Sequence, residues 1–183
     1  MMGNSQTDQS SPRIVGFAPI LGRYPRVLIL GSMPSVTSLE CGEYYAHPRN
    51  AFWPIVDALG LVDGNAPYAQ RVADLKQSGV ALWDSLKACE RSGSLDAAIV
   101  SDSEVANDFA VLFRKRPSIR VVAFNGNKAE QAFRRHVLPK LASESLDRLT
   151  LIRLPSTSPA HAIPFEQKLA AWREILRLLD PQF

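Results

Sequence analysis

The sequence predicts an α/β sandwich, in which helices cover both faces of a parallel β-sheet. Four short runs rich in Val, Ile or Leu each end in Gly or Ser: "RVLILG" (26–31), "GVALWDS" (79–85), "IRVVAFNG" (119–126) and "LTLIRLPS" (149–156). Continuous apolar runs of this kind are typical of strands buried on both faces. Stretches with helical spacing separate them, and strands that alternate with helices favour a parallel sheet.

Two of the helical stretches have clear signals. The run "AFWPIVDALG" (51–60) places Pro54 in a first turn, where proline is tolerated, and continues with apolar residues at helical spacing. Near the C-terminus, apolar residues recur at intervals of four, three, four and three positions, and Pro181 is expected to close the helix. The residues of this second pattern are Phe165, Leu169, Trp172, Leu176 and Leu179.

Length and composition indicate one globular domain. The chain has 183 residues, of which 46% are hydrophobic and 21% charged, and these are ordinary values for a globular protein. We expect a single domain over 13–183 after a disordered polar tail at 1–12, which lacks the apolar core of a signal peptide. A net charge of +3 permits a polyanionic partner without requiring one.

The cysteines and the hydropathy pattern exclude several classes of protein. Cys41 and Cys89 are the two cysteines, and they can form neither a disulfide framework nor a four-cysteine iron–sulfur site within one chain. No apolar run approaches the roughly 20 residues needed to span a bilayer. We therefore expect a reduced, cytoplasmic protein without a membrane association.

Three polar segments directly follow predicted strands: "GSMPS" (31–35), "NGNK" (125–128) and "PSTSPAHA" (155–162). The carboxyl ends of parallel strands meet at one edge of a sheet, where α/β proteins bind ligands. We expect these segments to lie together. Backbone amides near Gly31, Ser32 and Met33 are suited to hold an anion or a base edge, although a simple turn is the alternative.

The segment Tyr44–Asn50 carries aromatic and amide side chains. A tyrosine ring in a loop at a strand end can stack on a nucleobase, and Asn50 can orient a water molecule. The alternative for Asn50 is a cap of the helix that follows, and both roles can coexist. Tyr44 and Tyr45 are otherwise ordinary aromatic residues at a boundary.

The two later segments offer further polar groups. The Asn125 amide combines a donor with an acceptor, as reading a base edge requires, whereas a turn is its alternative role. Small hydroxyl groups of the loop after the fourth strand are suited to phosphates, and an apolar tip can enter a base stack. Two catalytic alternatives are a Lys128 amine nucleophile and a Ser32–His161–Asp84 triad. The segment "RSGSLDAAI" (91–99) is expected to add polar contacts at the same rim.

In this order, the segments resemble the uracil-DNA glycosylase superfamily over about 25–179. The set "GSMPS", "YYAHPRNAFW" and "STSPAHA" is most similar to its hypoxanthine-DNA glycosylase branch, the DNA-deoxyinosine glycosylases. This resemblance implies a three-layer α/β/α fold with a four-stranded, mainly parallel sheet. It also implies a monomeric, monofunctional enzyme that flips a deaminated base out of DNA and hydrolyses its N-glycosidic bond.

The resemblance implies hypoxanthine as the first choice of base and requires neither metal nor cofactor. Three alternatives remain: a mismatch-specific uracil-DNA glycosylase, a catalytically inactive DNA-binding module, and a hydrolase of free nucleosides. Loss of turnover with retained duplex affinity after mutation of Asn50 would separate an enzyme from a binding module.

The same resemblance assigns roles to individual residues. It gives water positioning to Asn50, stacking on the extruded base to Tyr45, and bonding of the base edge to Asn125. Met33 stands where most branches have Asp or Asn. Glu43 is the nearest carboxylate and the candidate to assist, although a solvated loop glutamate is the favoured alternative. The loop that enters the duplex, with Ala160 near the wedge position, comprises Ser156, Thr157, Ser158, Pro159, Ala160 and His161.

Overall fold

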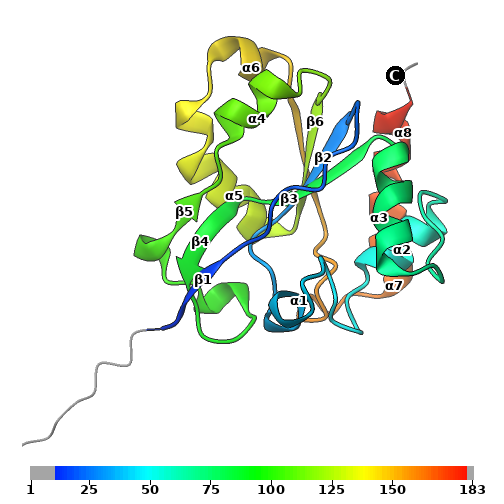
Figure 1. Ribbon diagram of the computed structural model, residues 1–183, viewed down its shortest axis with the longest axis horizontal. Coiled ribbons are helices and arrows are strands. Elements are labelled where there is room, and N and C mark those ends of the chain that lie inside the picture. The colour runs from blue at the N-terminus through cyan, green and yellow to red at the C-terminus, as the bar shows by residue number, and fades with distance from the viewer. Residues whose placement is uncertain (1–10, 181–183) are drawn as a thin grey trace, which may run out of the picture.

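A four-stranded parallel sheet forms the centre of the molecule (Figure 1), and the computed structural model describes residues 11–180. Its strands lie in the order β3-β2-β6-β7, and each neighbouring pair is parallel. The four predicted strands are these four, which confirms the α/β fold and a fully parallel central sheet. The strands are β2 (Val27–Gly31), β3 (Val80–Asp84), β6 (Val121–Asn125) and β7 (Thr150–Leu154).

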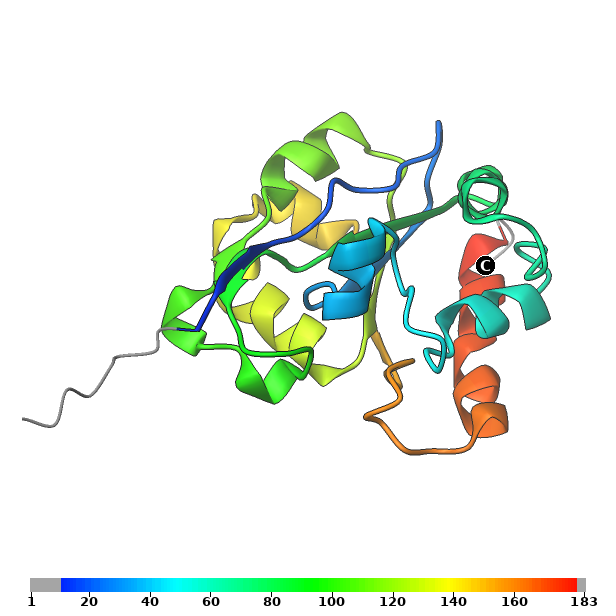
Figure 2. The ribbon, with the colours of Figure 1, turned by 60° about the horizontal axis from the view of Figure 1, so that its bottom comes forward.

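Helices cover both faces of this sheet, as the three-layer prediction requires (Figure 2). Side chains alternate between the faces along each strand, so Val27 and Ile29 join one core while Leu28 and Leu30 join the other. The helices packed against the first core are α2 (Phe52–Ala58), α3 (Tyr68–Gln77), α7 (Phe165–Trp172) and α8 (Glu174–Leu179). Those on the second face are α4 (Phe109–Lys115), α5 (Asn127–His136) and α6 (Ser143–Asp147).

The C-terminal helix predicted over 165–179 is two helices. α7 ends at Trp172 and α8 begins at Glu174, because the backbone tightens at Arg173, whose carbonyl accepts a bond from the Leu176 amide three residues on. After this tightening, Leu176 is exposed and Ile175 is buried instead. Phe165, at the start of α7, is also exposed. Pro181, the predicted stop, lies outside the described residues.

A second, antiparallel sheet was not predicted. Its strands β1 (Arg13–Val15), β4 (Leu86–Glu90) and β5 (Val105–Ala106) lie in the order β1-β4-β5 beside the central sheet (Figure 1). With three and two residues, β1 and β5 are too short to give a periodic signal. Of the tail predicted at 1–12, residues 1–10 lie outside the described residues, and the Pro12 carbonyl accepts a hydrogen bond from the Arg91 amide.

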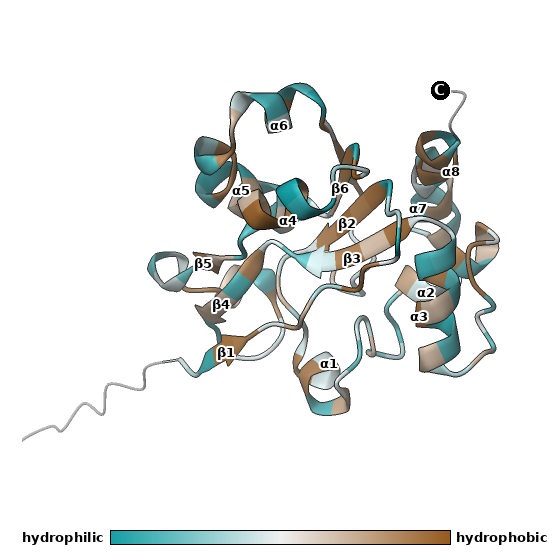
Figure 3. Ribbon diagram, turned by 45° about the horizontal axis from the view of Figure 1, so that its top comes forward, coloured by the Kyte–Doolittle hydropathy of each residue, from teal (hydrophilic) through white to brown (hydrophobic). Residues whose placement is uncertain are grey.

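Hydropathy follows the layers. Brown, apolar residues fill the central strands and the inner sides of the helices, whereas teal residues lie on the outer surface (Figure 3). Within residues 11–180, no helix has the length and apolarity that crossing a membrane demands.

The strand register brings the last residues of the four strands to one edge of the sheet. Gly31 is paired with Asp84, and Asn125 is paired with Leu154 at the end of the neighbouring pair. The connection from β2 to α1 (Val36–Cys41) and the loop after β7 both leave from this edge, at the bottom of Figure 1. The fold therefore gathers the strand-end segments on one side.

Candidate active site

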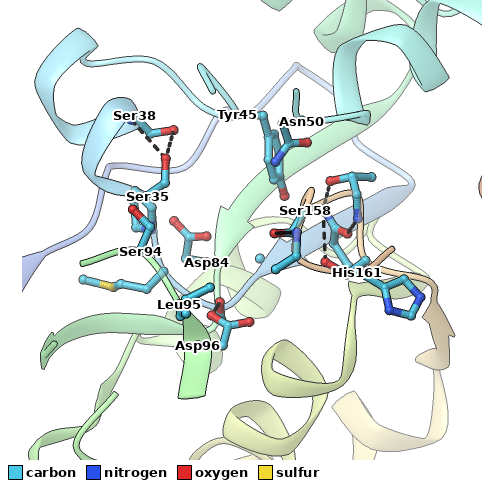
Figure 4. Close-up of a pocket in the computed structure, with 18 of the residues that line it drawn as sticks. Ser35, Ser38, Tyr45, Asn50, Asp84, Ser94, Leu95, Asp96, Ser158 and His161 are labelled. Carbon is cyan, nitrogen blue, oxygen red and sulfur yellow. Dashed lines mark hydrogen bonds between the residues drawn. The ribbon is translucent and has the colours of Figure 1, made fainter. Parts of the chain in front are cut away.

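A cavity of about 340 Å³ lies at the carboxyl edge of the parallel sheet (Figure 4). Strand ends, the Tyr44–Asn50 segment, the loop after β7 and the short helix η1 (Asp96–Ala98) contribute its walls. Of the residues predicted to form the site, Pro159 lies instead in a neighbouring groove beside Pro48 and Arg49. Those that line the cavity are Gly31, Ser32, Met33, Tyr45, Asn50, Asn125, Ser156, Thr157, Ser158, Ala160 and His161.

The segment after β2 presents mainly its backbone and one hydroxyl. The Ser32 hydroxyl donates to Asp96 Oδ1 at 2.5 Å. The Met33 side chain is buried in an apolar cluster with Leu86 and Cys89. Met33 therefore anchors this turn, and its backbone rather than its side chain is available at the cavity.

The segment 91–99 covers that turn from outside. The Arg91 side chain is buried, and its guanidinium donates to the carbonyls of Pro34 and Gly93. The Ser94 hydroxyl accepts a hydrogen bond from the Val36 amide at 2.9 Å. Ser94 therefore lies at the rim as expected, whereas Arg91 is buried and holds the turn through its hydrogen bonds to backbone carbonyls.

Asp84, at the end of β3, is a cavity residue that the sequence suggested only as a member of a triad. Its side chain is 3% exposed, and its Oδ2 atom is buried with no hydrogen-bond partner among the described residues. Burial, and then the negative charge of Asp96, raise the pKa of Asp84 to about 7, although Arg91 acts in the opposite direction. In the sequence, the only indication that Asp84 lies at the site is its position as a polar residue at the end of an apolar run.

The carboxylates of the cavity are thus Asp84 and Asp96, whereas Glu43 lines an adjacent pocket. The expectation that Glu43 is the nearest carboxylate is wrong, because the chain after α1 directs it to the other side of Tyr45. Asp96 was not singled out, although it lies within the segment 91–99 that was expected at this rim. It lies 64 positions from Ser32 in the sequence, and β4 is what returns the chain to the cavity.

Neither alternative catalytic arrangement is assembled. Ser32 is bonded to Asp96, and His161 lies on the opposite side of the cavity from Asp84, with its ring turned outward (Figure 4). Lys128 is not among the lining residues and its Nζ atom pairs with Glu104 Oε1 at 2.5 Å. The structure therefore supports neither a Ser–His–Asp triad nor an amine nucleophile at Lys128.

Tyr45 projects into the cavity from a constrained backbone (Figure 4). Its φ of 57° is the one positive value for a non-glycine residue within residues 11–180, and such strain often accompanies functional sites. One face of its ring stacks on Phe52, with centroids 4.1 Å apart. Its hydroxyl is buried beside Asn125, and burial together with the charge of Asp84 raises its pKa.

The amide of Asn50 is held in one orientation. Its Oδ1 atom accepts a hydrogen bond from the Phe52 amide at 3.0 Å, although Ala51 is the N-cap residue of α2. The oxygen is therefore fixed toward the helix, and the Nδ2 group is left for the cavity. Both roles considered for Asn50, the helix terminus and the site, are compatible with this geometry.

Asn125 binds the loop that follows β7. Its Nδ2 group donates to Thr157 Oγ1 at 2.9 Å, and its Oδ1 atom accepts from the Thr157 amide at 2.8 Å. The Thr157 carbonyl in turn accepts from the Ala51 amide at 2.9 Å. One N–H and one lone pair of the Asn125 amide remain for a ligand.

Helix α7 fixes the same loop at two further points. Trp172 Nε1 donates to the Pro155 carbonyl at 2.9 Å, and Lys168 Nζ donates to the Ser158 carbonyl at 3.1 Å. Directly after these two anchored positions, Pro159, Ala160 and His161 are exposed. The loop thus has a fixed base and an exposed tip beside the cavity.

We expect Gly31→Ala to destabilise the protein by about 1–3 kcal/mol, the usual cost of overpacking. A Cβ atom at this position would clash with Asp84 Oδ1 and lie 3.3 Å from the Tyr45 hydroxyl. Urea denaturation measures the effect. Gly16→Ala is the control, because its added methyl group would meet its nearest atom, Leu86 O, at 3.4 Å; equal stability of the two variants would contradict the packing described.

The sequence matches the family model described as "Uracil DNA glycosylase superfamily" over residues 20–180. It is 34% identical to "Hypoxanthine DNA glycosylase" of Methanosarcina acetivorans, over 88% of this chain and 97% of that protein. It is 37% identical to the protein of the same name from Methanosarcina barkeri, over 62% of this chain and 72% of that one.

The fold also matches a solved structure. A solution NMR structure of a candidate uracil DNA glycosylase from Methanosarcina acetivorans superimposes with a TM-score of 0.73. The alignment covers 92% of this chain and 99% of the other, at 31% sequence identity.

Proposed function

Because this chain belongs to the uracil-DNA glycosylase superfamily, we propose that it is a DNA glycosylase that hydrolyses the N-glycosidic bond of hypoxanthine in DNA. The membership predicted from the motifs is confirmed by the family match and by the two relatives named hypoxanthine DNA glycosylase. The observation that carries the proposal is the convergence of Asn50, Tyr45 and Asn125 on one cavity beside an exposed loop tip.

The partner is DNA that contains a deaminated base, bound by a monomer. Such a base must leave the duplex to reach a cavity at a sheet edge, and flipping costs least where the pair is already damaged. The tip formed by Pro159, Ala160 and His161 is placed to enter the space that the base leaves. Hydroxyl groups of Ser156 and Ser158 are available to phosphates at the base of that loop.

Tyr45 and Asn125 are the residues that hold the flipped base in this proposal. The strained backbone of Tyr45 keeps its ring projecting into the cavity, backed by Phe52. The free N–H and lone pair of Asn125 are suited to the ring N–H and carbonyl of hypoxanthine. The two hydrogen bonds to Thr157 keep the Asn125 amide from rotating away.

Asn50 positions the attacking water. Its amide orientation is fixed by the Phe52 amide, but an amide is a poor base at neutral pH. Cleavage of the glycosidic bond must therefore precede attack by water and gives an oxocarbenium-like sugar. The site stabilises the charges that develop in this transition state. Since no lysine is among the residues that line the cavity, water rather than an amine is the nucleophile, as a monofunctional enzyme requires.

The test is cleavage of labelled oligonucleotides that carry one hypoxanthine, uracil or xanthine, followed by alkali to break abasic sites. Each base is placed opposite all four partners and in single strands. Preferential cleavage at hypoxanthine is the expected result. Preferential cleavage at uracil would instead support a mismatch-specific uracil glycosylase, and free inosine as the sole substrate would support a nucleoside hydrolase. Duplex binding without any cleavage would leave a binding module.

We expect Lys168→Met to weaken binding to duplex DNA by about tenfold. The substitution removes a buried cation, 4% exposed, that bonds the Ser158 carbonyl and fixes the loop, and such a bond contributes on the order of 1.5 kcal/mol. Lys115→Met removes an equal charge from the exposed end of α4. Fluorescence anisotropy measures both affinities, and an equal loss for the two variants would contradict a specific role of Lys168.

A further inference from the structure

Asp84 has no role in the reaction as described, although it lines the cavity and is buried. We propose that Asp84 is a catalytic acid, which donates a proton to a ring nitrogen of the departing purine as the N-glycosidic bond breaks. This inference rests on the proposed glycosylase function and assigns the leaving-group half of its chemistry.

The first support is geometric. Asp84 ends β3 in register with Gly31, and the missing side chain of that glycine is what gives the carboxyl group its place. Its Oδ2 atom is buried without a hydrogen-bond partner among the described residues, and the residue lines the cavity. A polar atom left unpaired in this way is costly, so its retention at a cavity surface points to a ligand that completes it.

The second support is the distribution of charge around Asp84. Asp96 contributes a negative charge from η1, and the Tyr44 and Tyr45 hydroxyls approach from the segment after α1. The opposing cation is Arg91, which donates from Nε and Nη2 to the carbonyls of Gly93 and Pro34, while its Nη1 atom is buried without a hydrogen-bond partner among the described residues. Burial and Asp96 together give Asp84 a pKa of about 7, so the carboxyl group is substantially protonated at neutral pH.

The reaction balances with water as the only co-reactant. The bond between C1′ of the sugar and N9 of hypoxanthine breaks, and its electron pair stays on N9 as a lone pair. Asp84 Oδ2 gives its proton to the lone pair of ring nitrogen N7, so the base departs neutral, as the tautomer protonated at N7. Water held by Asn50 adds to C1′ and releases its proton to solvent, and Asp84 regains a proton from solvent.

A hydrogen bond alone would be a different role. An ionised Asp84 would accept an N–H of the base and help to select it, without proton transfer. The two roles differ in pH dependence: a catalytic acid is lost as the pH rises through its pKa, whereas an acceptor is gained over the same interval.

The experiment measures single-turnover excision of hypoxanthine between pH 5 and 9 by the wild-type protein and by Asp84→Asn and Asp96→Asn. For the wild type, the rate is expected to fall as the pH rises above about 7. Asp84→Asn keeps the size of the side chain but cannot transfer a proton, so we expect a loss of about 10²–10⁴-fold at pH 6 and a flat profile.

Asp96→Asn is the second variant, because it removes the negative charge that favours protonation of Asp84. For this variant, the excision rate is expected to fall at a lower pH than for the wild type. A fall at the same pH would contradict Asp84 as the titrating group. A wild-type rate that rises with pH, or an Asp84→Asn variant as fast as the wild type, would overturn the proposal. Absence of any wild-type cleavage would instead reject the glycosylase function itself, and urea denaturation excludes misfolding of the variants.

Discussion

Replacing Asn50 by alanine is expected to slow single-turnover excision of hypoxanthine by about 10²–10⁴-fold, the range for loss of a group that positions a reacting proton or water. The amide lies at the cavity with its oxygen fixed by the Phe52 amide. Without it, water at C1′ is no longer oriented. Duplex affinity is expected to change little, since the exposed loop tip and its anchors are untouched.

The same substitution also removes an acceptor at the start of α2, which costs about 1 kcal/mol of folding stability. Asn50→Asp separates the two effects, because a carboxylate still accepts from the Phe52 amide. We expect it to keep wild-type stability. Its second carboxylate oxygen replaces Nδ2 at the cavity and can accept a hydrogen bond from the water, so we also expect it to retain more activity than Asn50→Ala. An Asn50→Ala protein within threefold of the wild-type rate would remove Asn50 from the mechanism.

Asp84→Asn is expected to stabilise the folded protein while it removes activity. The side chain is buried and its pKa rises from the ordinary 3.8 to about 7, mainly through burial. An acid whose pKa is raised by folding penalises the folded state once it ionises. The penalty is absent below pH 4, grows between pH 4 and 7, and reaches about 4 kcal/mol above that interval.

The measurement is the free energy of unfolding in urea at pH 5 and at pH 8 for both proteins. The gain from Asp84→Asn should be larger at pH 8 than at pH 5. Asp102→Asn, in an exposed short helix, is the control and should show no such difference. A variant less stable than the wild type at pH 8 would mean that the Asp84 carboxylate has a stabilising partner in solution.

The central sheet was predictable because its strands are buried on both faces. Val27–Gly31 and its neighbours are continuous apolar runs, and this is a local property of the sequence. The break at Arg173 was not predictable from spacing, since both helices on either side keep helical periodicity. β5, with two residues, is defined only by its pairing with β4.

The site was predictable where it follows strand ends. The segments after β2, β6 and β7 meet because parallel strands place their carboxyl ends together. The two hydrogen bonds between Asn125 and Thr157 depend on the pairing of β6 with β7, which no local pattern of the sequence specifies.

The features of the site that the sequence did not show depend on the burial of side chains in the tertiary fold. Asp84 resembles a turn residue in the sequence, and only the tertiary fold shows its carboxyl group to be buried and unpaired. The Met33 side chain is buried in an apolar cluster with Leu86, and no local pattern of the sequence indicates this cluster. In both cases the surroundings of the side chain come from segments distant in the sequence.

The account is tested most directly by identifying the product released from a duplex with one hypoxanthine. The reaction is run under single-turnover conditions, and the released material is analysed by mass spectrometry. We predict free hypoxanthine in an amount equal to the alkali-labile sites in the DNA, and none from Asn50→Ala over the same time. Release of a nucleoside or nucleotide instead, or of no base at all, would contradict excision at this cavity.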